Sequence, residues 1–182
     1  MHTYCLASHA IPVPKDNLKY AIEQTYGIEI KIRLVPLETE LLRGQIERYD
    51  GWSRIYIDQG LKSQWTRYVF AKEASHHLLG QPEFYSTNIM STIDYIILDE
   101  REIDGDEVHP SKDIQAEMIT KFAAMEFLLP YEFREKTKAE IAEGKTTTFA
   151  VALQFDIPEH VVQYVLSDKY MLYAAWVWDS LK

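Results

Sequence analysis

The segment from Arg67 to Gly80, which reads R-Y-V-F-A-K-E-A-S-H-H-L-L-G, constrains this chain more than any other part of its sequence. Glu73 and His76 have the spacing of the second half of a His-Glu-x-x-His helix, in which two imidazoles lie one turn apart beside a glutamate that acts as general base at a zinc ion. Lys72 stands where the first histidine would be. A protonated lysine has no lone pair to donate to a metal, so this one position decides what chemistry the helix supports.

Composition limits the kind of protein that this chain forms. It has 182 residues, of which 47% are hydrophobic, which is enough for one well-buried domain. No apolar run approaches the ~20 residues that span a bilayer, and the N-terminus lacks the pattern of a secretory signal. The single cysteine, Cys5, excludes an internal disulfide and favours a cytoplasmic location. The formal charge of −9 argues against direct binding of nucleic acid.

Hydrophobic periodicity predicts a mixed α+β fold. Asp16 or Asn17 is expected to cap a first helix that ends at Tyr26, before Gly27. Asp50 and Gly51 predict a hairpin turn, so the three expected strands form a small antiparallel sheet. Ser63 is expected to cap the motif helix, with Gly80 ending it. The strands and later helices are expected at Ile28–Leu34, Gln45–Tyr49, Ser53–Asp58, Asp113–Leu129, Tyr131–Glu143 and, as one or two short helices, Phe149–Val165.

Between the two main helices, residues 81–110 contain eight acidic side chains and one basic side chain, Arg101. Asp104, Asp106 and Glu107 suggest an acidic cation or partner site. The alternative is a solvated connection, because the spacing matches no calcium loop.

Two helices in order, K-E-x-x-H on one and Q-A-E-M-I-T-K-F-A-A-M-E-F-L-L-P on the next, resemble the ImmA/IrrE-type metallopeptidase family. Members of that family carry R-F-T-x-A-H-E-x-G-H-x-L-L followed by a helix with Phe-Ala and Leu-Leu-x-Pro. The matched positions are Arg67, Ala71, Glu73, His76, Leu78 and Leu79 on the first helix and Phe122, Ala123, Leu128, Leu129 and Pro130 on the second. The resemblance implies one zincin-like domain over residues 1–168, followed by an aromatic C-terminal tail over residues 169–182.

The departures from the family pattern fall on the metal ligands. By the resemblance, Lys72 replaces the first histidine, Ala116 replaces the downstream glutamate ligand, and Thr120 replaces an asparagine or aspartate. Glu117 is the neighbour of Ala116, but one residue on a helix is a rotation of ~100°, which turns a carboxylate away unless the helix shifts. Of the family's three ligands, only His76 is in register.

Each site residue has two readings. Lys72 is a ligand if burial lowers its pKa by several units, or an ammonium that replaces the metal and pairs with Glu73, Glu117 or both. Glu73 is the general base if a metal activates water, and otherwise structural. His76, with Glu117, would hold any metal that binds, or His76 is a buried structural histidine.

Two further histidines lie within reach of the motif. His77 follows His76 and is expected on the solvent side of the helix. His109 lies in the acidic segment, where it either completes a site with His76 and Glu117 or is simply exposed. The tail residues Tyr170, Tyr173, Trp176 and Trp178 either form a docking or homodimer surface or fold onto the domain.

Two functions follow from the resemblance. In the first, the chain is a degenerate metallopeptidase-like protein without zinc that binds a protein partner, such as a helix–turn–helix repressor from a phage or mobile element. In the second, it is a zinc-dependent endopeptidase with unorthodox ligands that cuts such a repressor. The substitutions at Lys72 and Ala116 favour binding. No membrane partner is expected.

Overall fold

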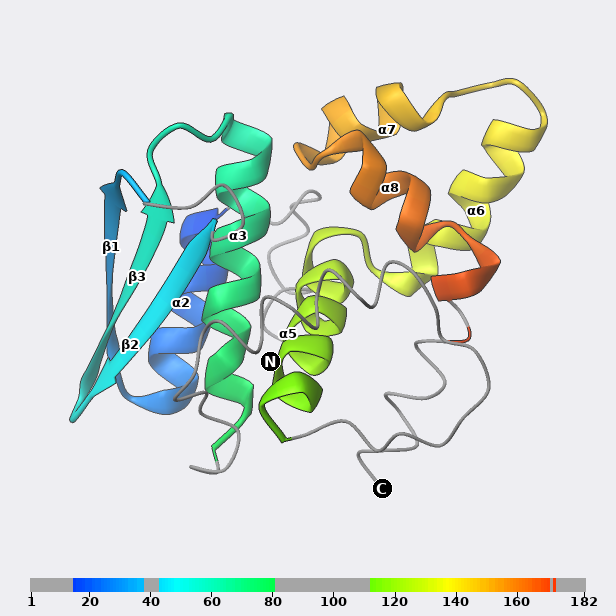
Figure 1. Ribbon diagram of the computed structural model, residues 1–182. Helices are drawn as coiled ribbons and strands as arrows, with labels where there is room; N and C mark the ends of the chain where they lie inside the picture. The colour runs from blue at the N-terminus through cyan, green and yellow to red at the C-terminus, as the bar shows by residue number, and fades with distance from the viewer. Residues whose placement is uncertain (1–14, 38–42, 81–111, 171, 173–182) are drawn as a thin grey trace.

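In the computed structural model, which describes residues 15–37, 43–80, 112–170 and 172, three strands form one small sheet (Figure 1). They are β1 (Glu29–Val35), β2 (Gly44–Tyr49) and β3 (Trp52–Asp58), in the order β1-β3-β2. The predicted hairpin between β2 and β3 is confirmed, and Gly51 in its turn has a φ of +72°, which favours glycine.

The prediction of an antiparallel sheet is wrong for one of the two strand pairs. β3 pairs antiparallel with β2 but parallel with β1. The physical reason is the place of β3: it inserts between β1 and β2 rather than at an edge. β2 runs opposite to β1, and the hairpin reverses the chain once more, so β3 runs in the same direction as its neighbour β1.

Helices α2 (Lys15–Tyr26) and α3 (Ser63–Ser75) cover one face of this sheet (Figure 1). Gly27, with a φ of +63°, follows α2 as expected. Neither of the two expected helix caps is at the predicted position. α2 already starts at Lys15, so that Asp16 is in its first turn, and Ser63 is the first residue of α3 after Lys62. α3 continues as a 3₁₀ turn, η1 (His76–Leu78).

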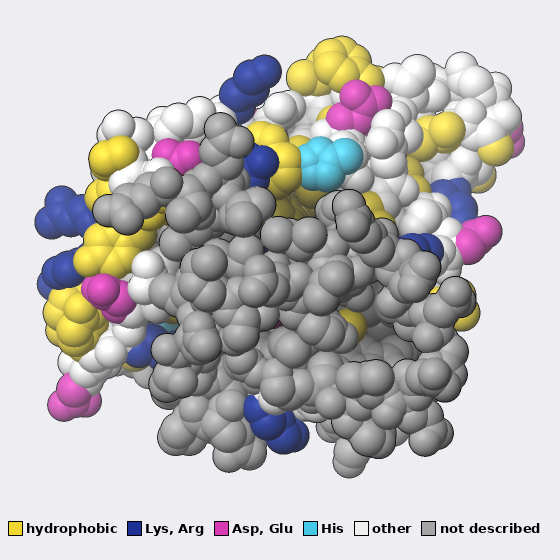
Figure 2. Space-filling model, in the orientation of Figure 1, with side chains coloured by type: hydrophobic (Ala, Val, Ile, Leu, Met, Phe, Trp, Pro, Cys, Tyr) yellow, Lys and Arg dark blue, Asp and Glu magenta, His cyan; other side chains and the backbone are white. Residues whose placement is uncertain are grey.

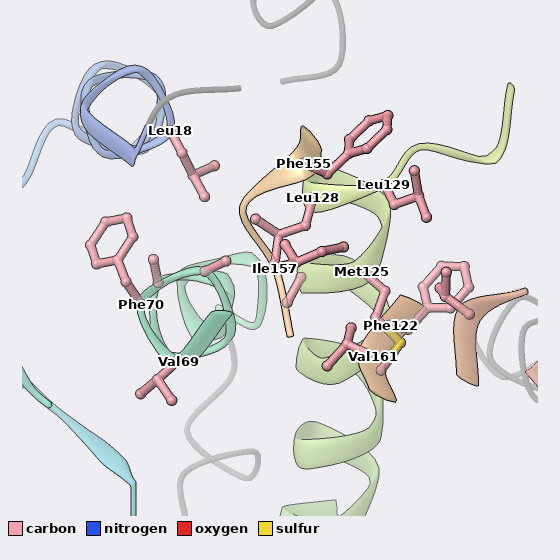
Figure 3. Packing of buried hydrophobic residues seen from close by; sticks show 14 of the residues in the cluster. Leu18, Val69, Phe70, Phe122, Met125, Leu128, Leu129, Phe155, Ile157 and Val161 are labelled. Carbon is pink, nitrogen blue, oxygen red and sulfur yellow. The ribbon is translucent and has the colours of Figure 1, made fainter. Parts of the chain in front are cut away.

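The remaining described helices lie beyond α3, away from the sheet. They are α5 (Lys112–Leu128), α6 (Tyr131–Ala142), α7 (Thr148–Phe155) and α8 (Glu159–Val165). Figure 3 shows the core between the sheet with its helices α2 and α3 and the later helices α5 to α8. Leu18 and Phe70 lie on the first side, and Met125, Leu128 and Phe155 lie on the second. The mixed α+β class is thereby confirmed. None of the described helices is long and apolar enough to cross a membrane.

The first aromatic residue of the C-terminal segment belongs to this core. Tyr170 is 0% exposed, its ring lies 5.9 Å from that of Phe122, and its hydroxyl donates to Glu126 Oε1 at 2.9 Å. The tail was expected either to form a docking surface or to fold onto the domain, and at Tyr170 it folds onto the domain. Several sequence predictions concern residues outside the described part of the chain, namely Cys5, Asp104, Asp106, Glu107, His109, Tyr173, Trp176 and Trp178.

Candidate functional site

The candidate site lies where α3 and α5 pack against each other, the most extensive contact between any two of the described helices. Small side chains are fully buried on both helices, which lets the two backbones approach closely. On α3 these are Ala71 and Ser75, and on α5 they are Ala116, Thr120 and Ala124, in each helix spaced four residues apart. The charged residues of the motif lie at this contact.

Lys72 lies between two carboxylates that come from different helices. Its Nζ is 2.9 Å from Oε1 of Glu73 on α3 and 2.7 Å from Oε2 of Glu117 on α5. The side chains of Lys72, Glu73 and Glu117 are 17%, 4% and 13% exposed. The expected pairing of Lys72 with both carboxylates is therefore present, and the ammonium ties α3 to α5.

His76 faces the same two carboxylates from the end of the motif helix. Its Nε2 lies 3.2 Å from Oε1 of Glu117 and 3.9 Å from Oε2 of Glu73. Its backbone carbonyl accepts a hydrogen bond of 2.7 Å from Arg48 of β2. That bond attaches the start of η1 to the edge strand β2 and so holds the backbone of His76 in place.

The charges of this cluster shift the pKa values of its members. Burial lowers the pKa of Lys72, but the negative charges of Glu117 and Glu73 outweigh it and leave that pKa above its ordinary value. Burial raises the pKa of Glu117, but the charge of Lys72 and the contact with His76 outweigh it and hold that pKa well below its usual range. Lys72 and Glu117 are therefore an ion pair at neutral pH. One turn earlier, burial raises the pKa of Tyr68 to about 12.

The structure changes the assignment of the site residues on α5. Ala116, the position in register with the family's glutamate, is 1% exposed and carries no ligand atom. Glu117, which was expected off the site unless the helix shifted but was also the candidate ligand beside His76, reaches both Lys72 and His76. The reason is that packing of the small buried side chains, not the motif register, sets the rotation of α5 about its axis. Thr120 is buried and its hydroxyl donates to the carbonyl of Glu117, so it supports the helix rather than lining the cluster.

The prediction that His77 is on the solvent side of the helix is wrong. His77 is half-buried against the sheet, where its Nε2 lies 3.0 Å from the hydroxyl of Ser53, a fully buried residue of β3. Burial, with the charge of Arg48, lowers the pKa of His77 to about 4. The expectation failed because α3 is covered on two sides, by the sheet and by α5. The polar inward position of Ser53 in β3 is the one signal in the sequence that hinted at this partner.

The donor set of the cluster does not fit a zinc ion. A catalytic zinc takes three protein ligands and a water, whereas here an ammonium lies in contact with both carboxylates that would serve. Of the ligand positions that the resemblance implies, only that of His76 carries the expected side chain. Over the described part of the chain, no three histidine, cysteine, aspartate or glutamate side chains are grouped so as to hold a metal ion.

Comparisons with models of known protein families, with curated proteins and with solved structures found no match for this chain.

Proposed function

We propose that this chain is a zincin-like protein of the ImmA/IrrE type that has lost zinc chemistry and acts, in the cytoplasm, by binding a protein partner. One observation carries the proposal: the ammonium of Lys72 lies 2.7 Å from a carboxylate oxygen of Glu117 and 2.9 Å from one of Glu73. A +1 charge between two carboxylates offsets their repulsion without a metal. Glu73 then serves the packing of α3 on α5 and not a water molecule.

The partner that the family resemblance favours is a helix–turn–helix repressor of phage or mobile-element origin. The net charge of −9 supports binding to the protein rather than to its DNA. The role is one of recognition, with no bond cut.

The first test is the zinc content of the chain, purified without chelator and without an affinity tag. We expect close to no zinc in the natural protein. In Lys72→His we expect about one zinc per chain, because the new imidazole would join His76 and Glu117. Lys72→His/Glu117→Gln is the matched control and should lose that zinc. Ala116→Glu is not needed, because Glu117 already faces the cluster.

One zinc per chain in the natural protein would refute the proposal and support the alternative, a zinc-dependent endopeptidase that cuts a repressor. The second test therefore separates binding from cleavage. The repressor encoded nearest to the gene of this chain is titrated against the protein by calorimetry, and the mixture is then analysed by mass spectrometry. We expect heat of binding with the repressor intact, and cleavage fragments would overturn the binding role.

A further inference from the structure

The sheet has a second face, which no helix or strand among the described residues covers (Figure 1). Side chains alternate along a strand, so the two faces of β3 carry different sets. Ile55 and Ile57 point into the core and are 0% exposed. Trp52, Arg54 and Tyr56 point to the other face, the outer face, and are each half-buried.

Aromatic rings and cations on the outer face are stacked on one another. The rings of Tyr49 and Trp52 lie 4.0 Å apart and 9° from parallel. Lys31 Nζ lies 4.5 Å from the centre of the Trp52 ring and the Arg54 guanidinium lies 5.1 Å from it. These distances are those of cation–π contacts, which hold the long basic side chains against the strands.

Glu47 completes the network from β2. It accepts hydrogen bonds from the hydroxyls of Tyr49 at 2.7 Å and Tyr56 at 3.0 Å, and it lies 3.8 Å from Arg54. Figure 2 shows hydrophobic, basic and acidic side chains interleaved along the flank of the molecule that the sheet occupies. Tryptophan, tyrosine and arginine dominate the energy of protein interfaces, and side chains that are already ordered lose little entropy on binding.

We propose that the outer face is the contact surface of a weak homodimer, in which it packs against the same face of a second copy. The charge pattern carries this choice of occupant. Strand register places Lys31, Arg54 and Glu47 in one row across β1, β3 and β2, with the ammonium at one edge and the carboxylate at the other. A two-fold axis along β3 sets Lys31 of each copy opposite Glu47 of the other. It also brings the two Arg54 side chains together at the axis, where each lies 3.8 Å from Glu47 of its own chain.

The balance of charge on the outer face also favours a second copy there. A net charge of −9 makes two copies of this chain repel each other. The outer face, by contrast, carries three basic and three acidic residues. These are Lys31, Arg33, Arg54, Glu29, Glu47 and Asp58.

The size of the outer face sets the strength of the contact. Three strands of about seven residues present roughly 300 Å² at the usual spacings of a sheet. A standard interface buries about 800 Å² per partner. The dimer is therefore weak and depends on concentration.

Analytical ultracentrifugation of the full chain, from about 1 μM to about 1 mM, tests the proposal. The average mass should rise from that of a monomer toward that of a dimer. Lys31→Glu, which sets two acids against each other, should weaken association by about tenfold, and Lys31→Glu/Glu47→Lys should restore it. Circular dichroism on each variant checks that the fold is kept.

Phe149→Asp is the matched control, because Phe149 is 58% exposed on α7, a helix that lies away from the sheet. It should leave the association unchanged. A monomer at all concentrations overturns the proposal, as does a dimer that Phe149→Asp disrupts and Lys31→Glu does not. A charge reversal that fails to restore the dimer rejects the pairing of Lys31 with Glu47 and, with it, this mode of dimer formation.

Discussion

At the residue scale, the contact of the Lys72 ammonium with Glu73 and Glu117 governs both the chemistry and the stability of the site. Removing one partner from a buried ion pair leaves the others as uncompensated charges. We therefore expect Lys72→Met to lower the free energy of unfolding by about 3 kcal/mol at neutral pH. Urea unfolding followed by circular dichroism measures this change.

Lys136→Met is the matched control for that variant. Lys136 is 76% exposed and forms an ion pair of 3.7 Å with Glu140 on the surface of α6. Exposed pairs contribute about 0–1 kcal/mol. If Lys72→Met lowers the free energy of unfolding as little as Lys136→Met does, the ammonium of Lys72 does not stabilise the site.

His77 makes the stability of the fold depend on pH. Burial lowers its pKa in the folded chain to about 4, below the ordinary histidine value of 6.5. Between those two values the unfolded chain binds more protons, so His77 contributes stability above pH 6.5 that is lost as the pH falls toward 4. We expect His77→Gln, which keeps a hydrogen-bonding group near Ser53, to lose less stability than the natural chain between pH 7 and pH 5.

The measurement is the urea midpoint of both proteins at the two pH values. Equal losses would mean that His77 does not remain neutral in the folded protein.

At the scale of the elements, the approach of β2 to α3 requires a glycine. A Cβ at Gly44 would overlap the Cγ1 atom of Val69 and lie 3.1 Å from Cγ of Glu73. Gly44→Ala should therefore push β2 away from α3 and cost about 1–3 kcal/mol of unfolding free energy. Thermal unfolding measures the loss.

Gly80→Ala is the matched control for Gly44→Ala, because it makes the same substitution at an uncrowded glycine. A Cβ at Gly80 has nothing within 4 Å. We expect this variant to be close to neutral or slightly stabilised. A similar melting temperature for the two variants would contradict the tight contact between β2 and α3.

Local sequence signals predicted most of the element boundaries. The periodic apolar residues of α5 and the proline after it gave a helix within one residue of Lys112–Leu128. Local signals did not predict the place of β3. The turn at Gly51 determines that β2 and β3 pair, but not on which side of β2 the strand β1 lies. That choice depends on which faces of the strands the helices bury.

At the scale of the whole molecule, Tyr170 joins the C-terminal segment to α5 and α6. Its hydroxyl and the guanidinium of Arg134 both bind Oε1 of Glu126, at 2.9 Å and 2.5 Å. We expect Tyr170→Ala to lower the free energy of unfolding by about 3–5 kcal/mol, because it removes a fully buried aromatic ring.

Leu172→Ala is the control, since Leu172 is 76% exposed. It should change stability by less than about 0.5 kcal/mol. If chemical unfolding shows equal effects for the two variants, the core ends before Tyr170.

The sequence by itself determined the kinds of elements, their order and the presence of an amine-bearing side chain, Lys72, one residue before Glu73 and four before His76. Periodicity and turn residues act over a few positions, and the identity of the side chain at position 72 is read directly from the sequence. Only the tertiary structure decided that Glu117 rather than Ala116 reaches the site, that His77 lies against Ser53, and that β3 runs parallel to β1. Each of these depends on how one element is rotated or placed against another. That arrangement is set by the packing of side chains far apart in the sequence.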